Sequence, residues 1–128
     1  MIDSRPTVVF ADDNAKVARV ACTLLDSAYK VVKVAADGEE AGRCIRDLKP
    51  DFAVLDISMP KIDGITLARQ LHESGSSTLV VFVTLIDDED YIREARLVGH
   101  GYVLKRRLSF DLLTALSAAR NGQFFCSH

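Results

Sequence analysis

Five short apolar runs alternate with longer segments in which apolar residues recur at helical spacing, and this alternation leaves few folds open to the chain. The runs cover residues 7–11, 31–35, 52–56, 79–84 and 102–104. Runs this short that end in turn residues indicate buried strands rather than helices. Strands that alternate with helices indicate parallel βαβ units joined by right-handed crossovers. The sequence therefore predicts a doubly wound three-layer α/β domain.

The segments between the runs are expected to be helices. Asn14 or Asp13 is a candidate N-cap of the first helix, and Asp63 of the third. The segment at about 88–98 has a thin apolar stripe, so we expect its helix to be the least well anchored. A last helix is expected at about 109–120.

Length and composition limit the class of protein. The 128 residues suit one domain, and 48% hydrophobic with 27% charged residues is ordinary for a globular chain. A formal net charge of −2 does not indicate the basic surface that nucleic-acid binding requires. No run is long enough to span a membrane, and the N-terminus does not resemble a signal peptide. Cys22, Cys44 and Cys126 have no metal-ligand spacing, so we expect free thiols in the cytoplasm.

Polar residues stand where four of the five predicted strands end. The first strand ends at Asp12 and Asp13, the third at Asp56, the fourth at Thr84 and the fifth at Lys105. The carboxyl ends of parallel strands share one edge of the sheet, where open α/β sheets bind their ligands. The fold would therefore gather three carboxylates, a hydroxyl and an ammonium in one place.

This set of groups restricts the chemistry. Clustered acids repel each other, and burial disfavours their charged forms. A hard divalent cation relieves both effects, and Mg²⁺ prefers oxygen ligands of which only one or two are carboxylates. Asp56 would then be free to attack phosphorus, with Lys105 and Thr84 neutralising or bonding the phosphoryl oxygens.

Each of these signals also has an ordinary structural interpretation. Asp12 or Asp13 alone would most simply be a cap or turn residue, and Thr84 a β-former that ends a strand. Lys105 alone would most simply be a solvated charge. Asp63 follows no strand end, so we interpret it as a helix cap. The functional interpretation depends on whether the remaining residues, at the ends of four strands, come together at one edge of the sheet.

Four segments resemble the receiver domain of bacterial two-component response regulators. They are Val-Val-Phe-Ala-Asp-Asp at 8–13, Val-Leu-Asp-Ile-Ser-Met-Pro-Lys-Ile-Asp-Gly at 54–64, Val-Thr at 83–84 and Gly-Tyr-Val-Leu-Lys at 101–105. The resemblance implies a flavodoxin-like (βα)5 sandwich with parallel strand order 2-1-3-4-5. It also implies that residues 1–128 are one receiver domain with a core of about 6–121.

The resemblance assigns roles to the acids. Asp56 would accept a phosphoryl group from a phosphohistidine on a sensor histidine kinase. Asp13, Asp56 and the backbone carbonyl of Ser58 would ligate Mg²⁺, with Mn²⁺ as a substitute, and Asp12 would hold a metal-bound water.

The same resemblance assigns a switch. Lys105 would pair with Asp56 at rest and with the phosphoryl group afterwards. Thr84 would follow the phosphoryl group inward, and Tyr102 would swing into the space that Thr84 leaves. The alternative for Tyr102 is an ordinary strand aromatic with its hydroxyl in water. The helix at about 88–98, which has only a thin apolar stripe, is the element expected to move in response to phosphorylation.

Two residues depart from the family pattern. Arg106 follows Lys105 where most members have a cis proline, so we predict a trans bond and an altered loop. Leu85 stands after Thr84 where most members have a small residue, and we expect it to crowd the path of Tyr102 or of the phosphoryl group. Ser58 and Ile86 occupy the positions that face the attacking water in the family.

The tail resembles that of regulators with a LuxR-type helix-turn-helix domain. It runs through Asn-Gly-Gln-Phe-Phe at 121–125, and in those proteins such a tail leads into a linker. Phe124 and Phe125 are therefore expected to need covering by another element. The output domain, absent from this chain, would bind DNA, and phosphorylation would drive homodimerisation.

Our leading interpretation is a phosphoryl-accepting receiver domain that regulates transcription through such an output domain. The alternatives are a stand-alone regulator or phosphorelay shuttle, and a receiver-like interaction module that is not phosphorylated. A hydrolase is disfavoured because neither His72 nor His100 stands at the acidic edge to act as acid or base. We therefore expect only Mg²⁺-dependent self-phosphorylation and autodephosphorylation, without enzymatic turnover.

Overall fold

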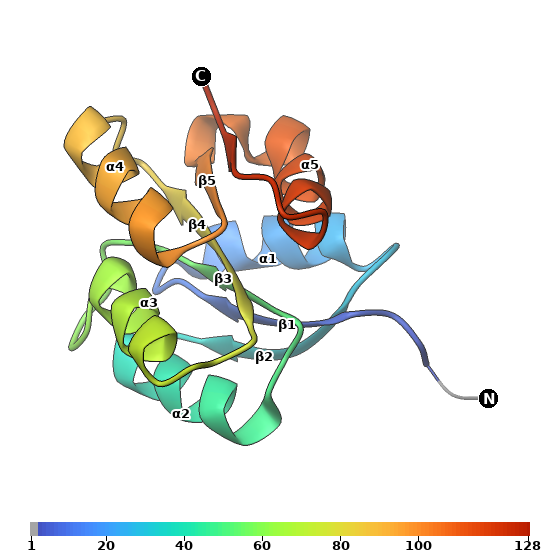
Figure 1. The fold of residues 1–128 in the computed structure, drawn as a ribbon. Coiled ribbons are helices and arrows are strands. Elements are labelled where there is room, and N and C mark those ends of the chain that lie inside the picture. Colours follow the sequence, from blue (N-terminus) through green and yellow to red (C-terminus); the bar gives the residue numbers. More distant parts are fainter. Residues whose placement is uncertain (1–2) are drawn as a thin grey trace.

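The structure is a computed structural model that describes residues 3–128. A parallel sheet is the middle layer, and helices cover both of its faces (Figure 1). The strands are β1 (Thr7–Ala11), β2 (Lys30–Ala35), β3 (Phe52–Leu55), β4 (Leu79–Thr84), β5 (Gly101–Leu104) and β6 (Phe125–Cys126). The helices are α1 (Ala15–Leu25), α2 (Gly38–Leu48), α3 (Gly64–Glu73), α4 (Glu89–Val98) and α5 (Leu108–Arg120), and a 3-10 turn, η1 (Lys105–Arg107), joins β5 to α5. The predicted doubly wound α/β fold is confirmed.

The strand order is β2-β1-β3-β4-β5-β6, and every neighbouring pair is parallel. The expected order 2-1-3-4-5 is confirmed for the first five strands. β3 and β5 are buried along their whole length, which is why their sequences are uniformly apolar rather than alternating. β2 lies at an edge and exposes Lys33 and Val34.

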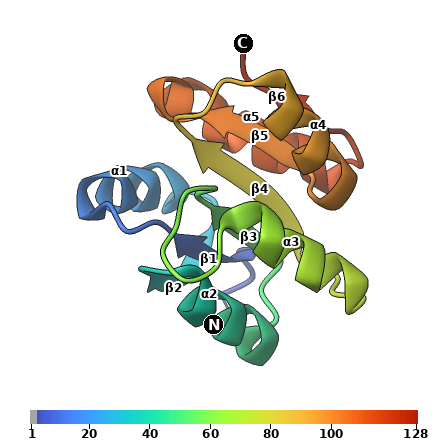
Figure 2. The same ribbon diagram turned by 90° about the vertical axis from the view of Figure 1, so that its left-hand side faces the viewer.

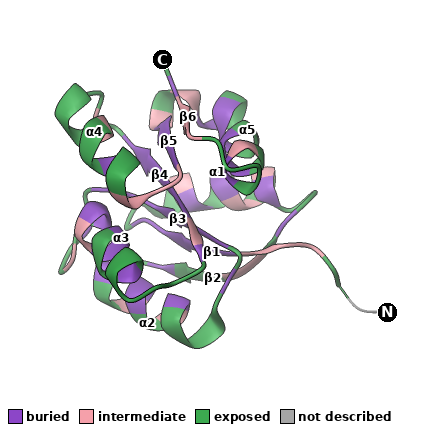
Figure 3. Ribbon diagram, in the orientation of Figure 1, coloured by how far each residue is buried: buried purple, intermediate pink, exposed green. Residues whose placement is uncertain are grey.

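The sheet separates two apolar cores. Helices α1 and α5 pack on one face, and α2, α3 and α4 pack on the other. Successive residues of a strand point to opposite faces, so in β1 Val8 and Phe10 join the first core while Val9 and Ala11 join the second. Figure 3 shows the buried residues concentrated in the sheet and on the helix sides that face it.

Side-chain caps fix where four helices begin. Asn14 Oδ1 accepts hydrogen bonds from the backbone N–H groups of Lys16 and Val17, so Asn14 rather than Asp13 caps α1. Asp63 caps α3, as predicted, by accepting from Thr66 N at 2.9 Å. Asp37 and Asp88 cap α2 and α4 in the same way. Each such cap is worth about 1 kcal/mol to a helix.

Helix α4 has the smallest buried face. Ala95 is its only buried residue, which agrees with the thin apolar stripe in the sequence. Tyr91 and Leu97 on the same helix are exposed. Elements with few buried contacts open most easily, so α4 is well placed to respond to a change nearby.

The C-terminal tail forms a sixth strand that the sequence analysis did not predict. β6 lies beside β5 (Figure 2), with Gly101 opposite Phe125 and Tyr102 opposite Cys126. The tail therefore pairs with the sheet as far as Cys126. Phe124 and Phe125 are half-buried, and the guanidinium of Arg96 lies 4.4 Å from the centre of the Phe124 ring. Pairing with β6 provides hydrogen-bond partners for backbone N–H and C=O groups of β5 that would otherwise be left to water at the edge of the sheet.

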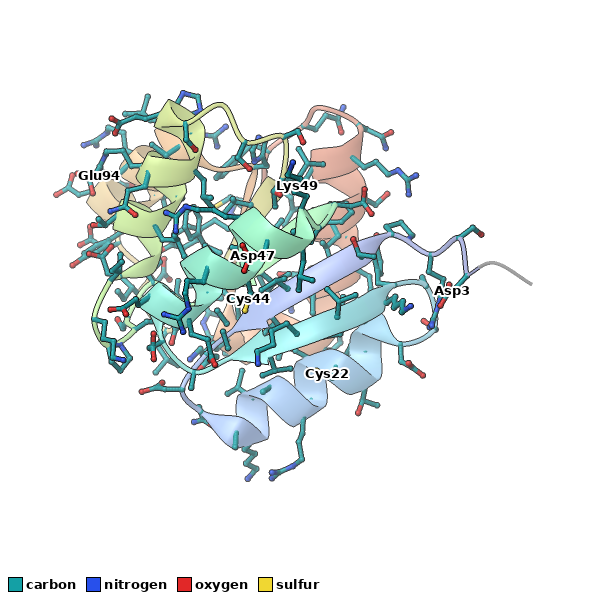
Figure 4. All side chains as sticks on the ribbon, turned by 90° about the horizontal axis from the view of Figure 1, so that it is seen from below. Asp3, Cys22, Cys44, Asp47, Lys49 and Glu94 are labelled. Atoms are coloured by element: carbon teal, nitrogen blue, oxygen red, sulfur yellow. The ribbon has the colours of Figure 1, made fainter. Side chains whose placement is uncertain are left out.

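All three cysteines are free thiols. Cys22 on α1 and Cys44 on α2, both labelled in Figure 4, belong to helices on opposite faces of the sheet. Within residues 3–128, no helix has the length and apolarity needed to cross a membrane.

Candidate functional site

Two hydrogen bonds carry the sheet ladder past the ends of β1 and β3. Asp12 N donates to Ala35 O at 3.0 Å, and Asp56 N donates to Ala11 O at 2.9 Å. The backbone therefore fixes both acids at one edge of the sheet. Their carboxylates are buried, whereas Asp13 is exposed. Carboxylate oxygens of Asp12, Asp13 and Asp56 lie within 4.8 Å of one another.

Lys105 reaches the same place from the turn after β5. Its Nζ lies 2.9 Å from Asp12 Oδ2 and 3.1 Å from Asp56 Oδ2. The lysine side chain is 12% exposed, so the ammonium has little access to water. The structure thus brings together four of the residues that the sequence analysis selected.

The cluster keeps an excess of negative charge. Burial and the neighbouring Asp12 raise the pKa of Asp56, and Lys105 opposes this rise without cancelling it. Burial by itself would lower the pKa of Lys105, but Asp12 and Asp56 raise it above the usual value. One ammonium therefore lies between two buried carboxylates, and the exposed Asp13 adds a third negative charge nearby.

The donor set fits a hard divalent cation. Asp12 Oδ2 is buried and, although it is within ion-pair distance of Lys105, it receives no well-directed hydrogen bond. Buried polar atoms normally have such a partner. Clustered carboxylate oxygens with unused bonding capacity are the ligands that Mg²⁺ prefers, and a cation would remove the repulsion among them.

The loop between β3 and α3 surrounds Asp56. Ser58 N donates to Asp56 Oδ1 at 3.2 Å, so the two carboxylate oxygens of Asp56 have different partners, Ser58 and Lys105. Ser58 itself is exposed. Gly64 N donates to Ile57 O at 2.8 Å and closes the loop.

Two glycines allow this loop to lie as close as it does. A Cβ at Gly64 would collide with the carbonyl oxygen of Asp56, and a Cβ at Gly38 would collide with that of Ile62. Gly38 N also donates to Pro60 O at 3.2 Å, which ties the loop to the start of α2. Sequence reasoning missed Gly38 as a site residue because only the fold brings α2 against the loop. The Asp-Gly pair that ends the second strand was its only signal.

Thr84 and Tyr102 both form hydrogen bonds with Ile86 and none with the acidic cluster. Thr84 is fully buried at the end of β4, and its Oγ1 accepts from Ile86 N at 3.1 Å. Tyr102 is 0% exposed, and its hydroxyl donates to Ile86 O at 2.6 Å. The alternative of a tyrosine hydroxyl in water is therefore wrong. Burial raises the pKa of Tyr102, so the hydroxyl remains a hydrogen-bond donor.

The sequence profile of the response regulator receiver domain matches residues 8–117. The chain belongs to the response regulator receiver domain family. That match includes all the residues of the acidic cluster and its lysine.

Curated relatives of this receiver domain include an enzyme and a regulator. Protein-glutamate methylesterase/protein-glutamine glutaminase 3 of Geobacter sulfurreducens is 37% identical over 111 residues, which are 84% of this chain and 30% of that protein. Oxygen regulatory protein NreC of Staphylococcus haemolyticus is 33% identical over 122 residues, which are 92% of this chain and 56% of NreC. The receiver domain therefore spans 30% to 56% of the length of these two relatives.

Solved structures agree with the fold. A LuxR-family two-component response regulator from Aurantimonas has a TM-score of 0.88 at 26% identity, over 95% of this chain and 89% of that one. The signal receiver domain of the putative regulator NarL from Mycobacterium tuberculosis has a TM-score of 0.82 at 26% identity, over 92% and 98% of the two chains. The isolated receiver domain of RcsB from Salmonella enterica, with a phosphomimetic beryllium fluoride, has a TM-score of 0.88 at 24% identity, over 98% and 95%.

The two departures from the receiver pattern have different outcomes. The Lys105–Arg106 bond is trans, as predicted, and no cis peptide occurs in residues 3–128. Leu85 is 79% exposed, so it does not crowd Tyr102 in this structure. Thr84 is the last residue of β4 and is fully buried, whereas the chain bends at Leu85, just beyond the strand, and leaves that side chain outside the core.

Neither candidate histidine belongs to the acidic edge. His100 Nδ1 accepts a hydrogen bond from Val80 N at 2.9 Å, where β4 and β5 begin. Burial lowers the pKa of His100, which keeps the ring neutral and suits its role as an acceptor. His72 is exposed on α3.

Proposed function

We propose that this receiver domain accepts a phosphoryl group on Asp56 from a phosphohistidine of a sensor histidine kinase. The observation that carries the proposal is the environment of the Asp56 carboxylate. It is buried, Oδ2 contacts the Lys105 ammonium, and two further acids stand within reach. Excess negative charge would repel a phosphodonor unless a cation neutralised it, and the oxygen ligands for that cation are in place.

The roles proposed for the surrounding residues are those that membership of the receiver family implies. Asp13, Asp56 and the Ser58 carbonyl would bind Mg²⁺, and Asp12 would hold one of its waters. Bound Mg²⁺ would neutralise charge on the incoming phosphoryl oxygens. An Asp56 oxygen would bond to phosphorus as the phosphorus–nitrogen bond of the donor breaks. The Lys105 ammonium, already beside Asp56, would then pair with a phosphoryl oxygen.

A local switch would follow phosphorylation. Thr84 Oγ1 already receives a hydrogen bond from Ile86 N, and Tyr102 donates to Ile86 O. A phosphoryl group adds about −1.5 to −2 charge and three acceptor oxygens, which would draw the Thr84 hydroxyl away from Ile86. Tyr102 shares the Ile86 contact, so the start of α4 would move with it. The small buried face of α4 makes such a movement inexpensive.

We further propose a regulatory role without enzymatic turnover beyond self-phosphorylation and autodephosphorylation. The positions of His72 and His100 away from the acidic edge support this. NreC and LuxR-family relatives support control of transcription through a DNA-binding output domain. Exposed Val20, Phe110 and Leu113 on α1 and α5 support homodimerisation by that pair of helices. The free thiols support a cytoplasmic location.

Intact-mass measurement after incubation with acetyl phosphate tests the proposal. We expect one phosphoryl adduct that requires Mg²⁺ and that is lost in Asp56→Asn. An adduct of equal yield in Asp56→Asn would show that another residue is the phosphoryl acceptor. No adduct on the parent with either Mg²⁺ or Mn²⁺ would favour an interaction module that is not phosphorylated.

A further inference from the structure

Lys105 stands on a turn with few side-chain anchors of its own. It opens η1, whose N-terminal end has no side-chain cap, and α5 follows without one. The carbonyl of Lys105 accepts a hydrogen bond from Leu108 N, and Arg106 reaches Asp87 through an exposed ion pair at 3.4 Å. Contacts from outside the turn also hold the backbone that leads into it.

Ser127 anchors the residue before Lys105. It lies just beyond β6 and is buried, and its Oγ accepts from Leu104 N at 3.1 Å. Ser127 N donates to Tyr102 O at 2.9 Å, which continues the pairing of β6 with β5. The tail thus reaches β5 at its last residue, one position before the lysine.

Asp111 completes the anchor from α5. It is buried, and its Oδ2 accepts from the Ser127 hydroxyl at 2.7 Å. Both of its oxygens also lie 3.3 Å from guanidinium nitrogens of Arg107, the last residue of η1. Burial by itself would raise the pKa of Asp111, but Ser127 and Arg107 hold it below the usual value, so the group is a charged acceptor. Asp111 therefore holds the residues on both sides of Lys105.

We propose that Asp111 and Ser127 are positioning residues that fix the backbone at 104–107 and thereby place the Lys105 ammonium against Asp56. Neither residue contacts Asp56, so each acts through the lysine. The consequence for phosphoryl uptake rests on the proposed function, whereas the placement of the ammonium does not. The competing explanation is that the two residues only hold down the tail.

The variants are Ser127→Ala and Asp111→Asn, the second of which keeps the shape of the side chain. Ser117→Ala on the exposed side of α5 and Asp47→Asn on α2 are matched controls at exposed positions. Asp47 is visible on the outer side of α2 in Figure 4. Thermal unfolding identifies any variant that fails to fold.

The first readout is independent of phosphorylation. We expect the ¹³Cε signal of Lys105 in NMR spectra to move towards the signals of exposed lysines in both variants, and the Leu104 amide to exchange faster in Ser127→Ala. An unchanged Lys105 signal in folded Ser127→Ala and Asp111→Asn would overturn the proposal, even if the tail amides exchange faster. Such a result would leave the pair as an anchor for the tail only.

The second readout is the initial rate of phosphoryl uptake from acetyl phosphate at saturating Mg²⁺. We expect a decrease of about tenfold in both variants, because small displacements of a charged group lower rates by factors of this order. The Mg²⁺ affinity should change less than twofold, since the acids stay in place. In a Lys105→Ala background, Ser127→Ala should cause no further decrease. A further decrease there would contradict action through the lysine, and a parent that takes up no phosphoryl group would instead refute the proposed function.

Discussion

Lys105 Nζ lies 3.1 Å from Oδ2 of Asp56, although the two residues are 49 positions apart in the sequence. The same ammonium lies 2.9 Å from Asp12 Oδ2. One largely buried ammonium thus links the ends of β1, β3 and β5. Its removal would leave two acids buried side by side.

Lys105→Ala should therefore destabilise the domain in the absence of metal. Loss of one partner of a buried ion pair costs about 3 kcal/mol, and partial protonation of the acids would reduce that cost. Mg²⁺ should bind this variant, because the acids remain, and should stabilise it more than it stabilises the parent. Urea unfolding in EDTA and in Mg²⁺ measures both effects. Equal stabilisation of parent and variant by Mg²⁺ would mean that the lysine and the metal ion do not neutralise the same carboxylates.

Asp13→Ala tests the metal ligands without disturbing the core, because Asp13 is exposed. We expect Mg²⁺-dependent shifts of amide signals next to Asp12 and Asp56 in the parent and at least a tenfold weaker affinity in the variant, since ligand number sets affinity for hard cations. Asp47→Ala, at an exposed acid on α2, is the control and should titrate like the parent. Undiminished affinity in Asp13→Ala would remove that residue from the metal site.

The raised pKa of Asp56 predicts a pH-dependent difference between the parent and Asp56→Asn. A carboxyl whose pKa is higher in the folded than in the unfolded state binds protons more readily when folded, so its contribution to stability falls as pH rises above the usual value of 3.8. Without Mg²⁺, Asp56→Asn should thus be more stable than the parent at neutral pH. The difference should shrink as pH falls through the raised pKa, because the parent side chain then becomes neutral too. Unfolding curves in EDTA across this pH range measure the difference in stability. A difference that grows on acidification would show that the pKa of Asp56 is lowered rather than raised.

Gly38→Ala should damage the loop around Asp56. The added methyl group would meet the backbone carbonyl of Ile62, which cannot rotate away, and overpacking of this kind costs about 1–3 kcal/mol. Gly42→Ala on the same helix is the control, because a Cβ there would meet side-chain atoms only, the flexible guanidinium of Arg46 and, at 3.2 Å, Cδ1 of Leu67. Alanine is favoured over glycine in helices by about 1 kcal/mol, which offsets the adjustment of Leu67, so the control should be clearly more stable than Gly38→Ala. Denaturant unfolding compares the three proteins, and equal stability of Gly38→Ala and Gly42→Ala would show that the loop is free to move.

Periodicity and strand ends predicted most of the fold. The buried parallel strands have uniformly apolar sequences, and this pattern located β1, β3, β4 and β5 along with the acids that follow them. Because the carboxyl ends of parallel strands share one edge of the sheet, we could predict that Asp12, Asp13, Asp56 and Lys105 lie at that edge. The structure brings these four residues together.

The remaining features depend on contacts that a local pattern does not encode. β6 has only two residues, too few to show an alternation, and it exists because β5 offers an open edge. The bond between Ser127 and Asp111 joins residues 16 positions apart that belong to no motif. Leu85 was expected to crowd Tyr102 or the phosphoryl group, but it is exposed because the chain bends just beyond β4, and the sequence pattern does not show that bend.

The most direct test of the account is a crystal structure grown with Mn²⁺ and beryllium fluoride, with an anomalous difference map at the manganese edge. The account predicts one peak about 2.2 Å from oxygens of Asp13, Asp56 and the Ser58 carbonyl, a distance typical of small divalent cations with oxygen ligands. It also predicts the beryllium fluoride on an Asp56 oxygen within bonding distance of Lys105 Nζ. A peak away from these oxygens, or a fluoride group on another residue, would contradict the account.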